Sequence, residues 1–192
     1  MVVHTTVTFN KAELLRLERD LKSFPKALPK VMQRGINDTL KTGRTKITRE
    51  IGGHVTVKAR EIRNRIKITK ATRVVFAGMI RIASTKIPLI KFGARETRKG
   101  VTVKVRKNGK RERITGAFVA TMNNGHKGIF KRTSEGGKRV PRLSIYELKG
   151  PTVTGVFEGA AGIATKVLSS LNATLTKNIA RNVDLIVNRI RK

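Results

Sequence analysis

Residues 101–114 read VTVKVRKNGKRERI, two runs of alternating residues on either side of Asn108-Gly109. This dipeptide favours a two-residue type I′ turn, whose twist matches that of the strands it joins. The pattern therefore predicts a β-hairpin in which Val103 lies opposite Ile114 and Val105 lies opposite Glu112. Further short runs of this kind, between about residues 72 and 132, predict a central, mostly antiparallel sheet with hairpins.

The predicted register places like charges opposite each other. One face would hold four cations and no acid: Lys104, Arg106, Arg111 and Arg113, with Lys107 and Lys110 beside the turn. Like charges directly opposite destabilise a ladder by up to about 1 kcal/mol per pair. Two interpretations are open. Either a polyanion or an acidic partner covers these six residues, or they are solvated charges that prevent the edge of the sheet from aggregating.

The net charge of the chain is the dominant feature of its composition. The 192 residues include 43 Lys and Arg but only 12 Asp and Glu, which gives a formal charge of +31. The cations are spread along the chain and become fewer only after residue 150. Self-repulsion on this scale favours polyanionic partners, either nucleic acid or acidic protein surfaces. We expect no membrane insertion, because no apolar run approaches about 18 residues, and the N-terminus lacks the pattern of a signal peptide.

The first part of the chain alternates between strand and helix patterns. Residues 2–9 predict a short strand, and Asn10 begins an amphipathic helix that extends to about Lys22. A longer helix is predicted from Pro29 to Ile51, ended by Gly52-Gly53, and a third over residues 57–66, capped by Thr56. Residues 133–142 predict a polar loop.

The last 35 residues carry the clearest helical pattern. Apolar residues recur at spacings of three and four along one stripe: Ile163, Val167, Leu171, Leu175, Ile179 and Val183. The narrow stripe predicts packing along another helix or oligomerisation. The predicted class is therefore α+β, with a core over residues 1–157 and a C-terminal helix over residues 158–192.

His126, in the segment NNGHKG, is the one candidate for catalysis. The chain has no cysteine, and no acidic residue lies between Glu112 and Glu135, so neither a local partner nor a metal-ligand spacing is present. The segment predicts a hairpin turn in which Gly125 and Gly128 supply unusual backbone angles. Phe118 and Phe130 on the flanking strands are expected to be core residues. We expect no catalytic residue, no metal and no cofactor.

Four segments in order along residues 24–157 resemble the minor tail protein Z family of tailed phages, also described as tail completion proteins. They are FPKALPKVMQRGINDTLKTGRTKITREI, IPLIKFGARETRKGVTVKV, ITGAFVATMNNGHKGIFKR and RLSIYELKGPTVTGVF. The resemblance implies a structural virion protein, made in the host cytoplasm, at the head-proximal end of the tail. It implies contacts with other neck and tail proteins such as the tail terminator and the head–tail connector. It also implies a ring, six-fold as in most tails, around the genomic double-stranded DNA.

Two other functions remain open on the residues alone. A sequence-nonspecific nucleic-acid-binding protein of ribosomal or nucleoid type would have the same composition. An enzyme such as a nuclease is poorly supported, because acidic residues and histidines are few.

Overall fold

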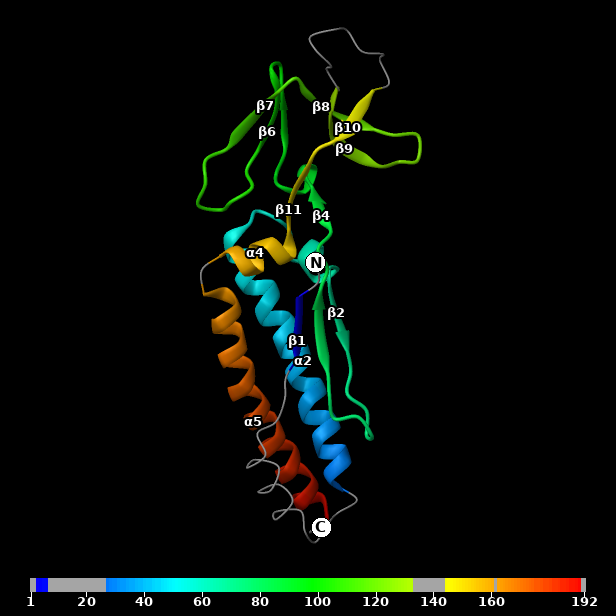
Figure 1. Cartoon of the computed structure of the whole chain (residues 1–192), viewed down its shortest axis with the longest axis vertical. Coiled ribbons are helices and arrows are strands. Elements are labelled where there is room, and N and C mark those ends of the chain that lie inside the picture. Colours follow the sequence, from blue (N-terminus) through cyan, green and yellow to red (C-terminus); the bar gives the residue numbers. More distant parts are fainter. Residues whose placement is uncertain (1–2, 7–26, 133–143, 161, 191–192) are drawn as a thin grey trace. The chain divides into compact units, whose positions relative to one another are not determined.

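The computed structural model describes residues 3–6, 27–132, 144–160 and 162–190 (Figure 1). It confirms the α+β class, with the strands divided among four small antiparallel sheets in the described part of the chain. The helix predicted from Asn10 and the loop predicted over residues 133–142 lie outside the described residues.

The chain divides into two compact units, each made of segments that are distant in the sequence. The first contains residues 1–48, 66–83 and 161–192, so the C-terminal helix shares a unit with the N-terminal third of the chain. The second contains residues 49–65 and 84–160.

The first unit is built on two antiparallel helices, α2 (Leu28–His54) and α5 (Ile163–Ile190) (Figure 1). The last residues of α2, from Arg49 onward, belong to the second unit. Helix α2 begins where predicted. It continues through Gly52-Gly53 to His54, so these glycines do not end it as predicted. The predicted C-terminal helix is confirmed as α5, but it begins at Ile163 rather than near residue 158. Helix α4 (Val153–Gly159) precedes it, and Gly162 between them has a φ of 81°, which suits glycine.

Glycines on α2 allow α5 to approach closely. A Cβ built on Gly35 would lie 2.6 Å from Ile179 Cγ1, and one on Gly43 would lie 2.9 Å from Leu171 Cδ2. Gly35, Thr39 and Gly43 are spaced four residues apart, so they lie on one face of the helix. This face of small residues receives the apolar stripe of α5.

The stripe is therefore covered within the chain. Five of its six residues are buried, namely Ile163, Val167, Leu171, Leu175 and Ile179, and Val183 is half-buried. The pattern was right about the helix face, but these residues are not left exposed for a second subunit.

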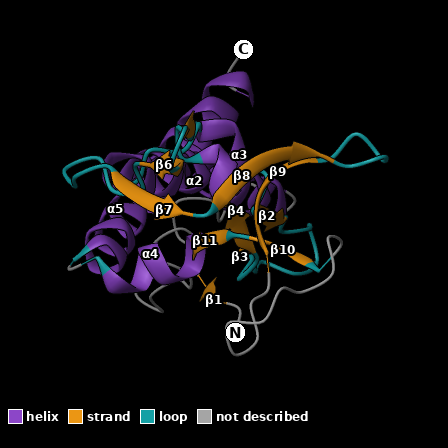
Figure 2. Cartoon of the chain, turned by 90° about the horizontal axis from the view of Figure 1, so that it is seen from above, coloured by secondary structure: helices purple, strands orange, loops and turns teal. Residues whose placement is uncertain are grey.

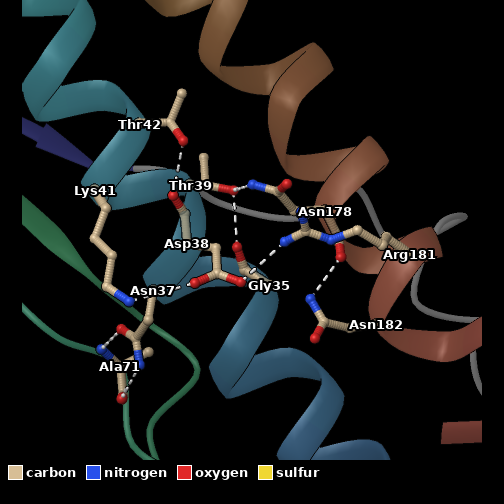
Figure 3. A network of polar contacts seen from close by, with 10 residues as sticks. All are labelled: Gly35, Asn37, Asp38, Thr39, Lys41, Thr42, Ala71, Asn178, Arg181 and Asn182. Carbon is tan, nitrogen blue, oxygen red and sulfur yellow. Dashed lines mark hydrogen bonds and ion pairs between the residues drawn. The ribbon is translucent and has the colours of Figure 1, made fainter. Parts of the chain in front are cut away.

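Polar contacts fix the register of α2 and α5 (Figure 3). The buried Asn178 side chain donates to Thr39 Oγ1 at 3.0 Å, and Thr39 donates to the Gly35 carbonyl at 2.8 Å. Arg181 pairs with Asp38 at 3.2 Å nearer the surface. Buried hydrogen-bonding groups must keep their partners, so sliding the helices would leave these groups unsatisfied.

A three-stranded sheet in the order β1-β3-β2 completes the first unit, with strands Val3–Thr6, Met79–Ile82 and Ile66–Thr69. Ile66, Ile80 and Ile82 are buried on its inner face. Lys67 and Arg81 alternate with them, lie opposite each other and are exposed.

The predicted third helix is shorter than expected. Helix α3 covers only Ala59–Arg63, its N-cap is Lys58 rather than Thr56, and Ile66 belongs to β2. Ile66 is buried by pairing with β3, so a tertiary contact overrides the helical pattern of this segment.

The second unit contains three small sheets (Figure 2). Phe92 is fully buried in its apolar core. Strand β4 (Lys86–Pro88) pairs with β11 (Lys149–Thr152), and a 3-10 turn (Leu89–Lys91) follows β4. Strands β8 (Ala117–Thr121), β9 (Lys127–Arg132) and β10 (Ile145–Glu147) form the second sheet. The third carries the predicted cationic hairpin.

Candidate polyanion-binding surface

The predicted hairpin exists, but its register is shifted by two residues. Strands β5 (Arg95–Thr97), β6 (Gly100–Val103) and β7 (Glu112–Thr115) form an antiparallel sheet in that order. Val103 pairs with Glu112, not with Ile114, and Arg113 lies opposite Thr102, not opposite Lys104. The predicted like-charged cross-strand pairs are therefore not formed.

Long-range pairing explains the shift. Residues after Val103 leave the hairpin and bind the end of α2 instead. Thr56 donates to the Val105 carbonyl at 3.0 Å, Lys107 donates to the His54 carbonyl at 3.0 Å, and Arg106 forms a bridge with Val55. These backbone bonds take the place of the short ladder that a two-residue turn would close.

The turn itself also differs from the prediction. Gly109 donates to the Arg106 carbonyl at 3.2 Å, which closes a four-residue turn over residues 106–109. Neither Asn108 nor Gly109 has a positive φ, whereas a type I′ turn needs one at both central residues. The predicted turn type is therefore wrong.

The β5-β6-β7 sheet separates its charges by face. Arg95, Thr102 and Arg113 are register partners in one row, so their side chains project from the same face. Glu96 and Glu112 lie on the other face, which also holds Val101 and Val103. A shift of two residues preserves this alternation, so Arg111 and Arg113 keep the face that the pattern predicts.

Arg111 is fixed against this cationic face. Its Nη1 donates to the carbonyl oxygens of Gly93 at 2.7 Å and Thr102 at 3.2 Å. Arg95 and Arg113 are exposed beside it. Neither they nor Arg111 form an ion pair with an acid in the described parts of the chain. We call Arg95, Arg111 and Arg113 the arginine face.

The other four predicted residues do not join the arginine face in the ladder. Lys104 is half-buried, with its N–H bonded to the Phe92 carbonyl at 3.1 Å. Arg106, Lys107 and Lys110 are exposed in the loop beyond β6. Sequence reasoning missed Arg95, because its place in the row depends on the pairing of β5 with β6. The short segment between Thr97 and Gly100 is the one local signal for that pairing.

The hairpin around His126 is confirmed, and Gly125 has the unusual φ of 77° expected of it. Gly128 does not. It lies in β9, where a Cβ would come within 2.9 Å of Glu147 Oε1.

His126 has an acidic partner that is distant in the sequence, because its Nε2 lies 2.8 Å from Glu147 Oε1 on β10. Phe130 is buried as expected, whereas Phe118 is only half-buried and packs beside it in a tilted arrangement, with ring centroids 6.4 Å apart.

A second charged cluster has a structural role. Glu61 on α3 pairs with Lys91 at 3.1 Å and Arg65 at 3.3 Å. Burial opposes ionisation of this carboxyl, but the hydrogen bonds and charges of Lys91 and Arg65 prevail and lower its pKa. The cluster joins α3 to the 3-10 turn after β4.

Two further findings concern the part of the chain that the structure describes. Its His, Asp and Glu residues form no group of three that could hold a metal ion. Among the same residues, no helix combines the length and hydropathy needed to cross a bilayer.

Comparisons with known proteins identify the family. The family model described as prophage minor tail protein Z (GPZ) matches residues 17–190. The match extends beyond the four segments quoted above and includes α5. No curated protein and no solved structure matches the chain. Because the family match covers most of the chain, the protein belongs to the prophage minor tail protein Z family and is a structural component of a phage tail.

Proposed function

We propose that this tail protein completes the head-proximal end of the tail, in a ring that contacts neighbouring neck and tail proteins and surrounds the genomic DNA. The arginine face is the observation that supports contact with DNA. It presents three guanidinium groups on one side of a sheet, with both acids of that sheet on the other. Arginine binds phosphate through planar, bidentate hydrogen bonds and needs no base sequence to do so.

The sharpest test is the salt dependence of DNA binding. We expect the triple variant Arg95→Gln, Arg111→Gln, Arg113→Gln to bind duplex DNA of arbitrary sequence more weakly. The plot of log K against log[salt] has a negative slope, and its steepness should decrease by about three, because each phosphate contact contributes about one. A matched control removes three exposed helical cations, Arg34, Arg49 and Lys177, by the same substitution. Equal slopes for the two variants would contradict the proposal.

The position in the particle needs a separate measurement. Phage that carry the arginine-face variant should assemble tails but join heads poorly or lose DNA, and imaging of the head–tail junction should locate the protein there. Strong binding to free DNA without any particle defect would instead favour the general nucleic-acid-binding function. Sedimentation of the purified chain, alone and with tail tubes, tests the ring.

A further inference from the structure

An exposed apolar turn closes the β2–β3 hairpin of the first unit. Val74, Val75 and Phe76 follow one another in it, with exposed fractions of 88%, 57% and 38%. We call these three residues the apolar tip. Single exposed apolar residues are ordinary on a protein surface, but three consecutive large ones are less common, and exposed apolar groups of this kind mark candidate contact sites.

The apolar tip is held in place at both ends. On one side, Ala71 is bound twice by Asn37 of α2, whose Nδ2 donates to the Ala71 carbonyl at 3.1 Å and whose Oδ1 accepts from the Ala71 N–H at 2.9 Å (Figure 3). On the other side, Gly78 packs so closely on α2 that a Cβ would lie 2.5 Å from Leu40 Cδ1.

The turn itself is also bonded. The Thr72 N–H donates to the Val75 carbonyl at 2.9 Å, and the Val75 N–H donates to Thr72 Oγ1 at 2.9 Å. The three apolar side chains are thus presented on a pre-organised loop, which lowers the entropy that a docking partner must overcome.

The charges around the apolar tip define the partner. Four exposed cations lie on the same hairpin, Lys67, Lys70, Arg73 and Arg81, and residues 66–83 contain no acid. A complementary surface therefore offers an apolar pocket with carboxylates at its rim. A second copy of this chain fits poorly. It has 12 acids against 43 cations, and three of the described acids, Asp38, Glu61 and Glu147, are already paired.

We propose that the apolar tip docks into an acidic-rimmed apolar pocket on a different protein of the tail. This inference rests on membership of the tail protein family and not on the arginine face, so the two can fail independently.

Incorporation into particles tests the importance of the tip. Tails assembled with Val74→Ser, Val75→Ser, Phe76→Ser should contain roughly tenfold less of the protein than wild-type tails, because three apolar contacts are lost. Leu168→Ser, which removes an exposed leucine from α5, should incorporate normally. Asn37→Ala should give an intermediate loss, because it loosens the loop but keeps its apolar residues. Normal incorporation of the triple variant, with circular dichroism showing it folded, would overturn the proposal.

Cross-linking identifies the partner. A photoreactive phenylalanine analogue at position 74, in assembled tails, should give a peptide of another tail protein in which apolar residues lie beside Asp or Glu. Cross-links to this chain, whether within one copy or between copies, would refute the proposal, and so would a complete absence of cross-links. Vesicles of phosphatidylglycerol provide the remaining comparison. Binding to them that requires Val74–Phe76, without a protein cross-link, would assign the tip to a membrane surface instead.

Discussion

Gly35 shows how a single residue sets the spacing of two helices. In an isolated helix, alanine is favoured over glycine by about 1 kcal/mol. At Gly35 the added Cβ would lie 2.6 Å from Ile179 Cγ1 and 3.4 Å from Ile179 Cα, which belongs to the backbone of α5. The side chain of Ile179 is buried, and protein interiors are close-packed, so it has little room to move aside.

We therefore expect Gly35→Ala to destabilise the protein by about 1–3 kcal/mol, as overpacking of a well-packed core does. The matched control is Gly53→Ala, also in α2, where nothing lies within 4 Å of the added Cβ. That variant should be as stable as the wild type or more stable, because only helix propensity changes. Urea denaturation of both variants measures the difference, and a Gly35→Ala protein of unchanged stability would show that α5 does not pack on α2 as closely as described.

At the scale of elements, two glycines of the β5-β6-β7 hairpin region differ in structural importance. The sequence pattern points to Gly109, whereas the structure points to Gly100. Gly109 belongs to the Asn-Gly dipeptide but has no positive φ, and a Cβ there would meet the exposed Arg106 at 3.2 Å. Gly100 has a φ of 134°, and a Cβ there would collide with the Ile114 carbonyl oxygen on the paired strand.

We expect Gly100→Ala to cost about 2 kcal/mol or more, because strain and collision add. Asn108→Ala and Gly109→Ala should each change the unfolding free energy by less than about 0.5 kcal/mol, as exposed substitutions usually do. Thermal and urea unfolding of the three single variants would decide the matter. A large loss of unfolding free energy in Gly109→Ala would instead support the type I′ turn that the Asn108-Gly109 dipeptide predicts.

The same sheet shows which features a sequence can predict. Alternation gives the face of each residue, and Arg111 and Arg113 share a face in either register because the shift is an even number of residues. The stripe from Ile163 to Ile179 is likewise a local repeat. The register itself depends on backbone bonds between residues 104–107 and the end of α2, about fifty positions away. Contacts of this kind leave no periodic signal, which is also why the His126–Glu147 contact and the place of Arg95 were missed.

At the scale of the whole molecule, positive charge is shared evenly by the two units. The first has 20 Lys and Arg with 5 acids, and the second has 23 with 7, so their net charges are +15 and +16. Neither unit neutralises the other. Anions that stabilise the protein must therefore act on both, either as diffuse counter-ions or as a polyanion bound at particular residues.

These two modes of stabilisation can be separated by measurement. Sodium chloride should raise the melting temperature of the wild type, because screening weakens self-repulsion throughout the chain. Short duplex DNA at low salt should raise it further, since a ligand that binds the folded state stabilises it by RT ln(1 + [L]/Kd).

The arginine-face variant lowers the net charge from +31 to +28, so its response to sodium chloride should hardly change. Its response to DNA should fall sharply if phosphates bind at Arg95, Arg111 and Arg113. If both responses fell only in proportion to the lost charge, DNA would be held by the overall field of the protein and the arginine face would have no special part in binding it.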